Sequence, residues 1–271
     1  MNKLPIWDNH GCFPTPYDDV NTVLLDLMAR IQMILGSKFV GLYLYGSLAL
    51  GDFDPQTSDI DFIVVTESGL SAELIPALRE MHGKFDRSSS PWAGKVEAAY
   101  VPLDALKHAA SATTPYPQIE KGTELFLAPL EIGWAFQRYT LREQGVVVSG
   151  PRPVTFTDPV DLVEMQRAAA AILGDWQERA RHDPDWIAWM RKRGCQAFVV
   201  LTICRLLLSL ETGSVASKPA TARWAQKTLG PSRELLIQRA LASQHEDQEI
   251  SDIELKDTLD FLDEALKQIQ K

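Results

Sequence analysis

Two aspartates separated by one apolar residue constrain the fold of this chain more than any other feature. They lie in the segment Ser58-Asp59-Ile60-Asp61-Phe62, at the start of an apolar run that continues to Val65. Side chains two positions apart on a β-strand point to the same face of a sheet. The sequence therefore predicts a strand over 60–65 that buries Ile60 and Phe62 and presents both carboxylates together on the opposite face.

Two neighbouring carboxylates repel each other, so they favour a cation between them. Mg²⁺ suits this pair, because it binds one or two carboxylates and completes its shell with water and substrate phosphates. Such an ion neutralises charge on a phosphoryl group during its transfer. We therefore predict Asp59 and Asp61 as Mg²⁺ ligands. For the pair alone, the alternative is an ordinary turn followed by two surface aspartates.

Gly46 and Ser47 end another predicted strand, the β-branched and aromatic run over 39–45. A glycine there lets the backbone approach a ligand closely, and exposed N–H groups with a serine hydroxyl bind phosphate oxygens. The order of strand, Gly-Ser turn, loop and second strand with two aspartates predicts a phosphate site beside a metal site.

The chain changes character near Thr123. Before it, apolar periodicity predicts helices over 17–35 and 70–82 and a third strand over 96–101. After it, we predict helices over 124–144, 158–181, 195–211, 219–229, 231–243 and 251–270. Pro151 and Pro153 stiffen an extended connection and predict a linker. The expected fold is α/β plus all-α: an N-terminal domain over 1–150 with a small mixed sheet flanked by helices, and a helical bundle over 151–271.

Charge and composition limit the class of partner. The net charge is −9, and the longest basic stretch is Arg191-Lys192-Arg193. Nucleic-acid partners favour basic surfaces, so we expect a small neutral or cationic substrate and no nucleic acid. The longest apolar run, 197–210, contains Arg205 and predicts no membrane span. Three cysteines without metal-ligand spacing favour a reducing cytoplasm. We expect a monomer.

The Gly-Ser turn and the Asp-Ile-Asp segment resemble the signature of the nucleotidyltransferase superfamily related to DNA polymerase beta. The whole chain resembles the aminoglycoside adenylyltransferases that modify streptomycin and spectinomycin. The similar segments are Leu44-Tyr45-Gly46-Ser47, Ser58-Asp59-Ile60-Asp61, Val96-Glu97, Val148-Ser149-Gly150-Pro151, Thr202-Ile203-Cys204-Arg205, Ala216-Ser217-Lys218 and Arg223-Trp224-Ala225. The resemblance implies transfer of AMP from ATP to a hydroxyl of an aminoglycoside-like acceptor, with release of pyrophosphate, between the two domains.

The resemblance also implies roles for single residues. A glutamate at the place of Glu97 is the family's general base, which removes a proton from the acceptor hydroxyl. Ser47 and Ser58 would contact the triphosphate, and Arg205 and Lys218 would approach it from the helical domain. The alternatives are a solvent-facing glutamate on a strand, a structural ion pair for Arg205 and a plain surface lysine at 218.

One segment departs from the resembled family. Those enzymes hold their cationic drug partly with a carboxylate just before the helix that carries the equivalent of Arg205. Here that segment is Met190-Arg191-Lys192-Arg193-Gly194-Cys195, which is basic. Asp183, Asp185, Trp186 and Trp189 lie upstream, either as a substitute or as an aromatic cluster with ordinary surface acids. Two other hypotheses therefore stay open. One is a nucleotidyltransferase for another small molecule or a protein hydroxyl, and the other is a non-catalytic nucleotide-binding module.

Overall fold

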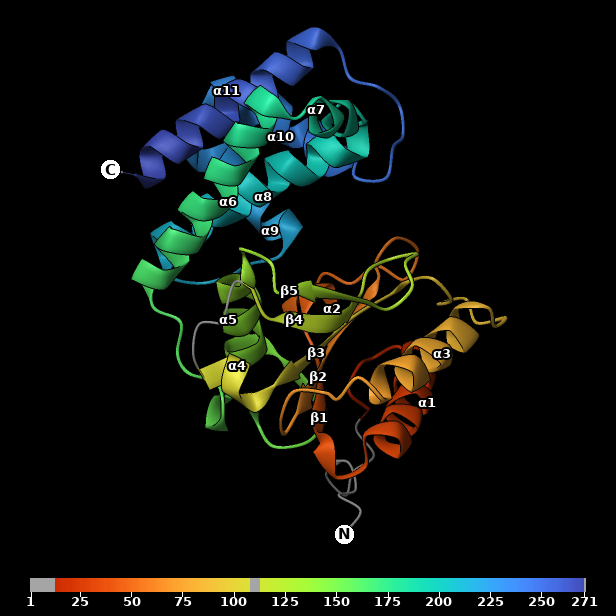
Figure 1. Cartoon of the computed structure of the whole chain (residues 1–271). Coiled ribbons are helices and arrows are strands. Elements are labelled where there is room, and N and C mark those ends of the chain that lie inside the picture. The colour runs from red at the N-terminus through yellow and green to blue at the C-terminus, as the bar shows by residue number, and fades with distance from the viewer. Residues whose placement is uncertain (1–12, 108–112, 271) are drawn as a thin grey trace. The chain divides into compact units, whose positions relative to one another are not determined.

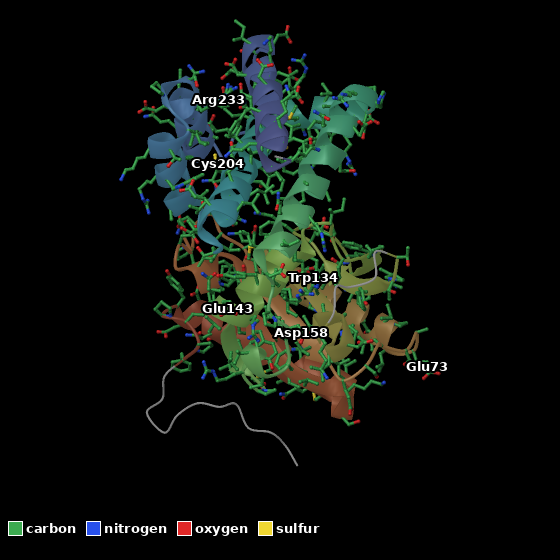
Figure 2. The ribbon with its side chains drawn as sticks, turned by 90° about the vertical axis from the view of Figure 1, so that its left-hand side faces the viewer. Glu73, Trp134, Glu143, Asp158, Cys204 and Arg233 are labelled. Atoms are coloured by element: carbon green, nitrogen blue, oxygen red, sulfur yellow. The ribbon has the colours of Figure 1, made fainter. Side chains whose placement is uncertain are left out.

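The computed structural model describes residues 13–107 and 113–270. The chain forms two compact units, one up to Pro159 and the other from Val160 (Figure 1). The division falls at Pro159, not at residue 150, because the segment after Gly150 is tied to the first unit. The Tyr43 hydroxyl donates to the Pro151 carbonyl at 2.9 Å, and Asp158, labelled in Figure 2, donates its N–H to Leu106.

The first unit contains a six-stranded mixed sheet with the order β5-β4-β3-β2-β1-β6. Its strands are β1 (Phe39–Leu44), β2 (Ile60–Thr66), β3 (Val96–Pro102), β4 (Pro115–Ile119), β5 (Phe126–Pro129) and β6 (Val146–Ser149). Only β2 and β3 pair in parallel; every other neighbouring pair of the sheet is antiparallel. The predicted mixed sheet is therefore confirmed.

Helices cover both faces of this sheet. Figure 1 shows α1 (Asp18–Leu35) and α3 (Leu74–Asp86) on one side, and α4 (Leu103–Lys107) and α5 (Trp134–Gln144) on the other. The short α2 (Gly46–Leu50) follows β1, and single 3₁₀ turns span Gly36–Lys38 and Pro153–Thr155. Trp134, labelled in Figure 2, is buried at the start of α5 and packs in the apolar core on the α4 and α5 side of the sheet.

Strand alternation divides the apolar residues between two cores. Ile60, Phe62 and Val64 of β2 pack in the core under α1 and α3. Ile63 and Val65 pack in the core under α4 and α5. Asp61 shares the odd numbering of this second set, so the strand directs its side chain to the face opposite Ile60 and Phe62, whereas Asp59 precedes the strand. The prediction that Ile60 and Phe62 are buried is confirmed, with both fully inaccessible to solvent.

Part of the predicted helix over 124–144 is wrong. Residues Phe126–Pro129 form β5, which pairs antiparallel with β4, and only Trp134–Gln144 is helical. Strand β4 was not predicted, because Pro115 and Pro117 argue against a central strand; β4 lies next to the edge strand β5, where prolines are tolerated better. The predicted helix over 70–82 also shifts to Leu74–Asp86.

The second unit is built from helices joined by loops. Its helices are α6 (Leu162–His182), α7 (Pro184–Met190), α8 (Arg193–Thr212), α9 (Lys218–Thr228), α10 (Pro231–Ala242) and α11 (Asp252–Ile269). Helix α8 lies at the centre and contacts each of the other five. By length and composition alone α8 is apolar enough to cross a membrane, but 61% of that window is buried inside the structure, as in the core helix of a bundle.

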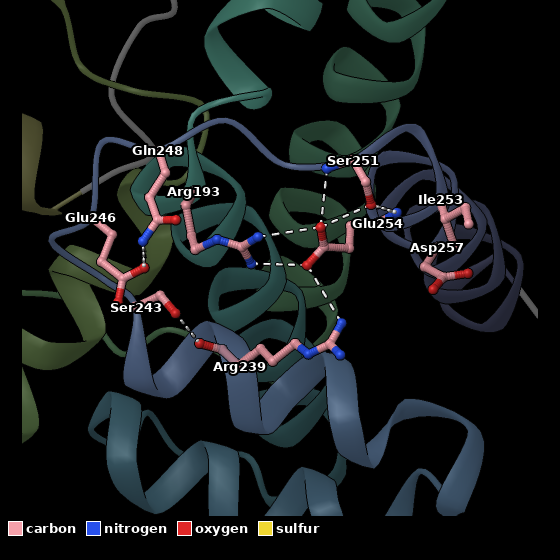
Figure 3. A pocket seen from close by; sticks show the side chains of 9 residues that line it. All are labelled: Arg193, Arg239, Ser243, Glu246, Gln248, Ser251, Ile253, Glu254 and Asp257. Carbon is pink, nitrogen blue, oxygen red and sulfur yellow. Dashed lines mark hydrogen bonds and ion pairs between the residues drawn. The ribbon is translucent and has the colours of Figure 1, made fainter.

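The basic segment before α8 is neutralised by the start of α11. Arg193 and Arg239 both contact the carboxylate of Glu254, at 3.0 and 3.4 Å, beside an open recess of about 630 Å³ (Figure 3). Ser251 and Glu254 also form a capping box at the start of α11. The hydrogen bonds from Arg193 and Ser251 lower the pKa of Glu254 from 4.5 to about 2. Glu254 thus joins α8, α10 and α11 through its charge.

We predict that Glu254→Gln destabilises the second unit by about 1–3 kcal/mol at pH 7, because two arginines lose their carboxylate. The pKa of Glu254 is lowered by folding, so its contribution is present above pH 4.5 and is lost as the pH falls toward 2. Urea denaturation at pH 7 and pH 3, with hydrogen exchange on α8 and α11 peptides, measures both effects. The control is Asp252→Asn, whose ion pair with Arg191 is 87% exposed on the aspartate side and should contribute less than about 1 kcal/mol. If Glu254→Gln lowers the free energy of unfolding by the same amount at pH 3 as at pH 7, the role of Glu254 is contradicted.

Candidate active site

The candidate site lies at one end of the sheet of the first unit, where the ends of three neighbouring strands meet. Strands β2 and β3 begin there, and the antiparallel β1 ends there. Asp61 and Glu97 are direct register partners in the parallel β2–β3 pair. Side chains of paired residues project to the same face, so two carboxylates lie side by side on neighbouring strands. Both are half-buried, whereas Ile60 and Val96, which precede them, are buried in the first core.

Gly46 gives the Asp61 carboxylate its space. It starts α2 with a φ of 60°, a conformation that favours glycine. A Cβ atom on Gly46 would overlap Oδ2 of Asp61. The N–H of Tyr45 also donates to the Asp61 carbonyl at 3.2 Å. The Gly-Ser turn is therefore built directly against the second aspartate.

Asp59 lies just before β2 and faces a cation from elsewhere in the chain. Nζ of Lys121 is 2.9 Å from Oδ1 and 3.2 Å from Oδ2 of Asp59. Ser58 closes the preceding turn, since its hydroxyl accepts the N–H of Asp54 at 3.0 Å. Ser47 lies inside α2, where its carbonyl accepts the N–H of Gly51. The structure thus brings Gly46 and Glu97 against Asp61, and Asp59 near Glu97, while Ser47 and Ser58 are chain neighbours of Gly46 and Asp59.

The electrostatic surroundings of Glu97 favour its protonated form more than water does. Burial and the nearby carboxylate of Asp59 raise its pKa, while a hydrogen bond from the backbone of Lys121 opposes the increase. Burial of the Tyr45 hydroxyl raises its pKa well above the usual value, and the negative charges of Asp61 and Glu97 raise it further. Tyr45 therefore keeps its hydroxyl proton and is a neutral neighbour of the carboxylates. A raised carboxylate pKa beside a charged pair is a common feature of general bases.

The donor set fits a divalent cation that brings further ligands with it. Among residues 13–107 and 113–270, no group of three or more His, Cys, Asp or Glu side chains is arranged to hold a metal ion. Asp59 and Asp61 supply carboxylate oxygens alone, which is the usual protein contribution to a Mg²⁺ site completed by phosphates. The ammonium of Lys121 shows that the Asp59 carboxylate already attracts a cation.

Arg205 and Lys218 belong to the second unit. Arg205 lies half-buried in the middle of α8, between the buried Cys204 and Leu206. Lys218 is the first residue of α9, which is capped by Ser217 and followed by Pro219 in its first turn. The predicted helix over 219–229 thus begins one residue earlier, at Lys218.

Asp183 and the upstream tryptophans have structural roles in the second unit. The Asp183 side chain accepts the N–H of Trp186 at 3.0 Å and caps α7. Trp186, Trp189, Trp176 and Phe198 form a cluster with ring centroids 6.1–6.5 Å apart. Neither α7 nor the presence of Lys121 and Tyr45 near the carboxylates was predicted from the sequence. A Lys-Gly pair in Glu120-Lys121-Gly122-Thr123 signals a turn, but nothing local connects that turn to Asp59.

Comparison with known families assigns both halves of the chain. Residues 30–101 match the nucleotidyltransferase domain, and this segment contains all six candidate residues of the first unit. Residues 157–268 match the C-terminal domain of aminoglycoside adenylyltransferases, which begins close to the division at Pro159. The chain belongs to the aminoglycoside adenylyltransferase family. It is an enzyme of the nucleotidyltransferase class.

Individual relatives of this aminoglycoside adenylyltransferase family member cover most of the chain. An aminoglycoside (3'') (9) adenylyltransferase of Escherichia coli is 27% identical over 243 residues, which is 84% of this chain and 88% of the relative. A Klebsiella pneumoniae protein of the same name is 27% identical over 221 residues, 78% and 79% of the two chains. The crystal structure of spectinomycin adenyltransferase AAD(9) from Enterococcus faecialis with ATP and spectinomycin has a similar fold. Its TM-score is 0.66 at 15% identity, covering 91% of this chain and 99% of that one.

We predict that Gly46→Ala lowers pyrophosphate release by this adenylyltransferase family member about a hundredfold, because the added methyl displaces the Asp61 carboxylate. Gly51→Ala is the matched control. Gly51 has a φ of 76° and would bear similar backbone strain, about 1–2 kcal/mol, but its Cβ meets no atom within 4 Å. Steady-state pyrophosphate assays and urea denaturation of both variants separate strain from displacement. Equal loss of activity in both variants would show that the Gly46–Asp61 contact is unimportant.

Proposed function

We propose that this enzyme transfers AMP from ATP to a hydroxyl group of an aminoglycoside and releases pyrophosphate. The observation that carries the proposal is the register pairing of Asp61 with Glu97, beside Asp59 and the Gly46–Ser47 turn. Asp59, Asp61 and Glu97 all lie in the segment that matches the nucleotidyltransferase domain. The names of the relatives and the ATP in the similar crystal structure support ATP as the donor and an aminoglycoside as the acceptor.

In the proposed reaction Glu97 accepts the proton of the acceptor hydroxyl. The oxygen forms a bond to the α-phosphorus of ATP as the bond from that phosphorus to the bridging oxygen of the β-phosphate breaks. Pyrophosphate leaves with the electron pair of the broken bond. The raised pKa of Glu97 suits this role, since a stronger base accepts the proton more readily.

Asp59 and Asp61 would hold Mg²⁺, which supplies positive charge to the triphosphate as charge develops on the leaving group. Gly46, Ser47 and Ser58 would contact the triphosphate, as the family resemblance implies. Gly46 packs against Asp61, Ser47 follows Gly46 in the chain and Ser58 precedes Asp59. From the second unit, Arg205 and Lys218 would add cationic contacts to phosphate, as the family resemblance implies. We propose that the enzyme is a monomer in the cytoplasm, where ATP and a small acceptor are both available. We propose no nucleic-acid or membrane partner.

A second candidate keeps the reaction and changes the acceptor to another small molecule or a protein hydroxyl. It is favoured by one observation: Asp183 is engaged in capping α7, so it is not a free substitute for the drug-binding carboxylate of the resembled family. Pyrophosphate release measured with ATP, Mg²⁺ and a panel of streptomycin, spectinomycin and other aminoglycosides separates the candidates. Acceptor-dependent release supports the first; ATP binding without stimulation by any member of the panel supports the second.

We predict that Asp61→Asn and Glu97→Gln fail in different ways. Loss of a metal-ligand charge should lower turnover about a thousandfold or more and weaken ATP binding in Mg²⁺. Loss of the base should lower kcat by about 10²–10⁴-fold while ATP binding remains. Calorimetry with ATP and pyrophosphate assays measure the two properties. Glu67→Gln, an exposed carboxylate after the other end of β2, is the control and should retain activity. Full turnover by Asp61→Asn would remove the metal-ligand assignment.

We also predict that Lys218→Met weakens ATP binding about tenfold or more, because a charge-assisted hydrogen bond to phosphate is lost. Lys227→Met, in the last turn of the same helix, is exposed and should bind ATP like the unmodified enzyme. Titration calorimetry with ATP and Mg²⁺ provides both dissociation constants. Equal affinities for the two variants would assign Lys218 to structure alone.

A further inference from the structure

The turn between β4 and β5 holds Lys121 in a defined place. Thr123 donates its N–H to the Glu120 carbonyl at 3.0 Å, and Glu120 donates its N–H to the Thr123 hydroxyl at 3.1 Å. Gly122 adopts a φ of 72°, which such a turn requires at its third position. Lys121 is therefore the second residue of a closed four-residue turn, and its backbone is fixed on both sides.

Strand pairing directs this turn to the carboxylates. Ala98 of β3 pairs with Ile119 of β4 in antiparallel register. Continuing that register, the residues after Ile119 run back along the start of β3, toward Glu97. The backbone N–H of Lys121 hydrogen-bonds the Glu97 side chain. The turn thus supports the proposed base through its backbone and leaves the lysine side chain available for another contact.

That second contact is with Asp59. Nζ of Lys121 lies 2.9 and 3.2 Å from the two carboxylate oxygens, at the position of a cation bridging both oxygens. The side chain of Asp59 is 22% exposed and that of Lys121 is 50% exposed. A half-exposed ion pair of this kind is weakly stabilising, and a lysine side chain changes rotamer at little cost. The ammonium is therefore held at Asp59 but is easily displaced.

We propose that Lys121 is a placeholder cation, which occupies Asp59 when no divalent ion is bound and must leave Asp59 before a divalent ion can bind there. The inference rests on the proposed function, because it takes Asp59 as a metal ligand. An ammonium and a divalent cation repel each other and cannot share the same carboxylate oxygens. Lys121 is thus a positioning residue with two effects. It raises the concentration of metal needed to fill the site, and it offsets the negative charge of Asp59 when no metal is bound.

Binding of Mn²⁺ to the full chain without nucleotide tests this, measured by electron paramagnetic resonance of the free ion. Lys121→Gln should bind Mn²⁺ about three- to tenfold more tightly than the unmodified protein, since the competing charge is gone. Lys121→Arg keeps the charge and should stay within about twofold of the unmodified protein. Lys95→Gln is the matched control for the loss of one positive charge, because Nζ of Lys95 lies 5.5 Å from the centre of the Trp92 ring and is not paired with Asp59. It should leave Mn²⁺ affinity unchanged.

The double variant Asp59→Asn, Lys121→Gln locates the effect. If Lys121 competes at Asp59, the gain in affinity from Lys121→Gln disappears when Asp59 is an asparagine. A Lys121→Gln variant that binds Mn²⁺ no more tightly than the unmodified protein, or a gain that persists without Asp59, overturns the inference. Mn²⁺ with α,β-methylene-ATP distinguishes this from failure of the proposed function: metal binding that is then insensitive to Asp59→Asn removes Asp59 as a ligand altogether.

Discussion

The parallel pairing of β2 with β3 is the constraint on which the proposed site depends. It places Asp61 beside Glu97, so the sheet itself holds two like charges together at the edge where β1 ends. Each strand is fixed by buried neighbours, including Ile60, Phe62 and Val96, which are inaccessible or nearly so. The strands cannot slide to relieve the repulsion, because a one-residue shift would expose those apolar side chains. The repulsion is therefore a built-in property of the fold, and it has to be relieved by protons or cations.

The surrounding residues relieve it in different ways. The raised pKa of Glu97 favours a proton on that carboxyl, and the ammonium of Lys121 offsets the charge of Asp59. Gly46 gives Asp61 room without adding a counter-charge. Strain and unfavourable charge of this kind persist at functional sites when the surrounding structure fixes them. A divalent ion bound between the carboxylates would relieve the repulsion that destabilises the unloaded site.

Local sequence patterns predicted the central strands but could not predict contacts between residues far apart in the sequence. The apolar run over 60–65 and the Gly46–Ser47 turn predicted β2, the burial of Ile60 and Phe62 and the end of β1, because each depends on neighbours in the sequence. Strands β4 and β5 were missed because prolines at 115, 117 and 129 argue against strands unless the sheet edge is known. The Lys121–Asp59 contact joins residues 62 positions apart, and no periodicity encodes such a pair. Likewise α7 was missed because Pro184 and a seven-residue helix leave little periodic signal.

The basic segment before α8 illustrates how structure changes the meaning of a sequence departure. In the sequence, Arg191 and Arg193 lie in the segment where the resembled family has a drug-binding carboxylate. In the structure Arg191 contacts Asp252 at 2.7 Å and Arg193 contacts Glu254 at 3.0 Å, so both charges are balanced by α11 within the same unit. A balanced arginine repels a cationic acceptor much less than a lone one. The basic side chains therefore reflect packing of this segment against α11. Recognition of a cationic acceptor would then depend more heavily on carboxylates elsewhere in the chain.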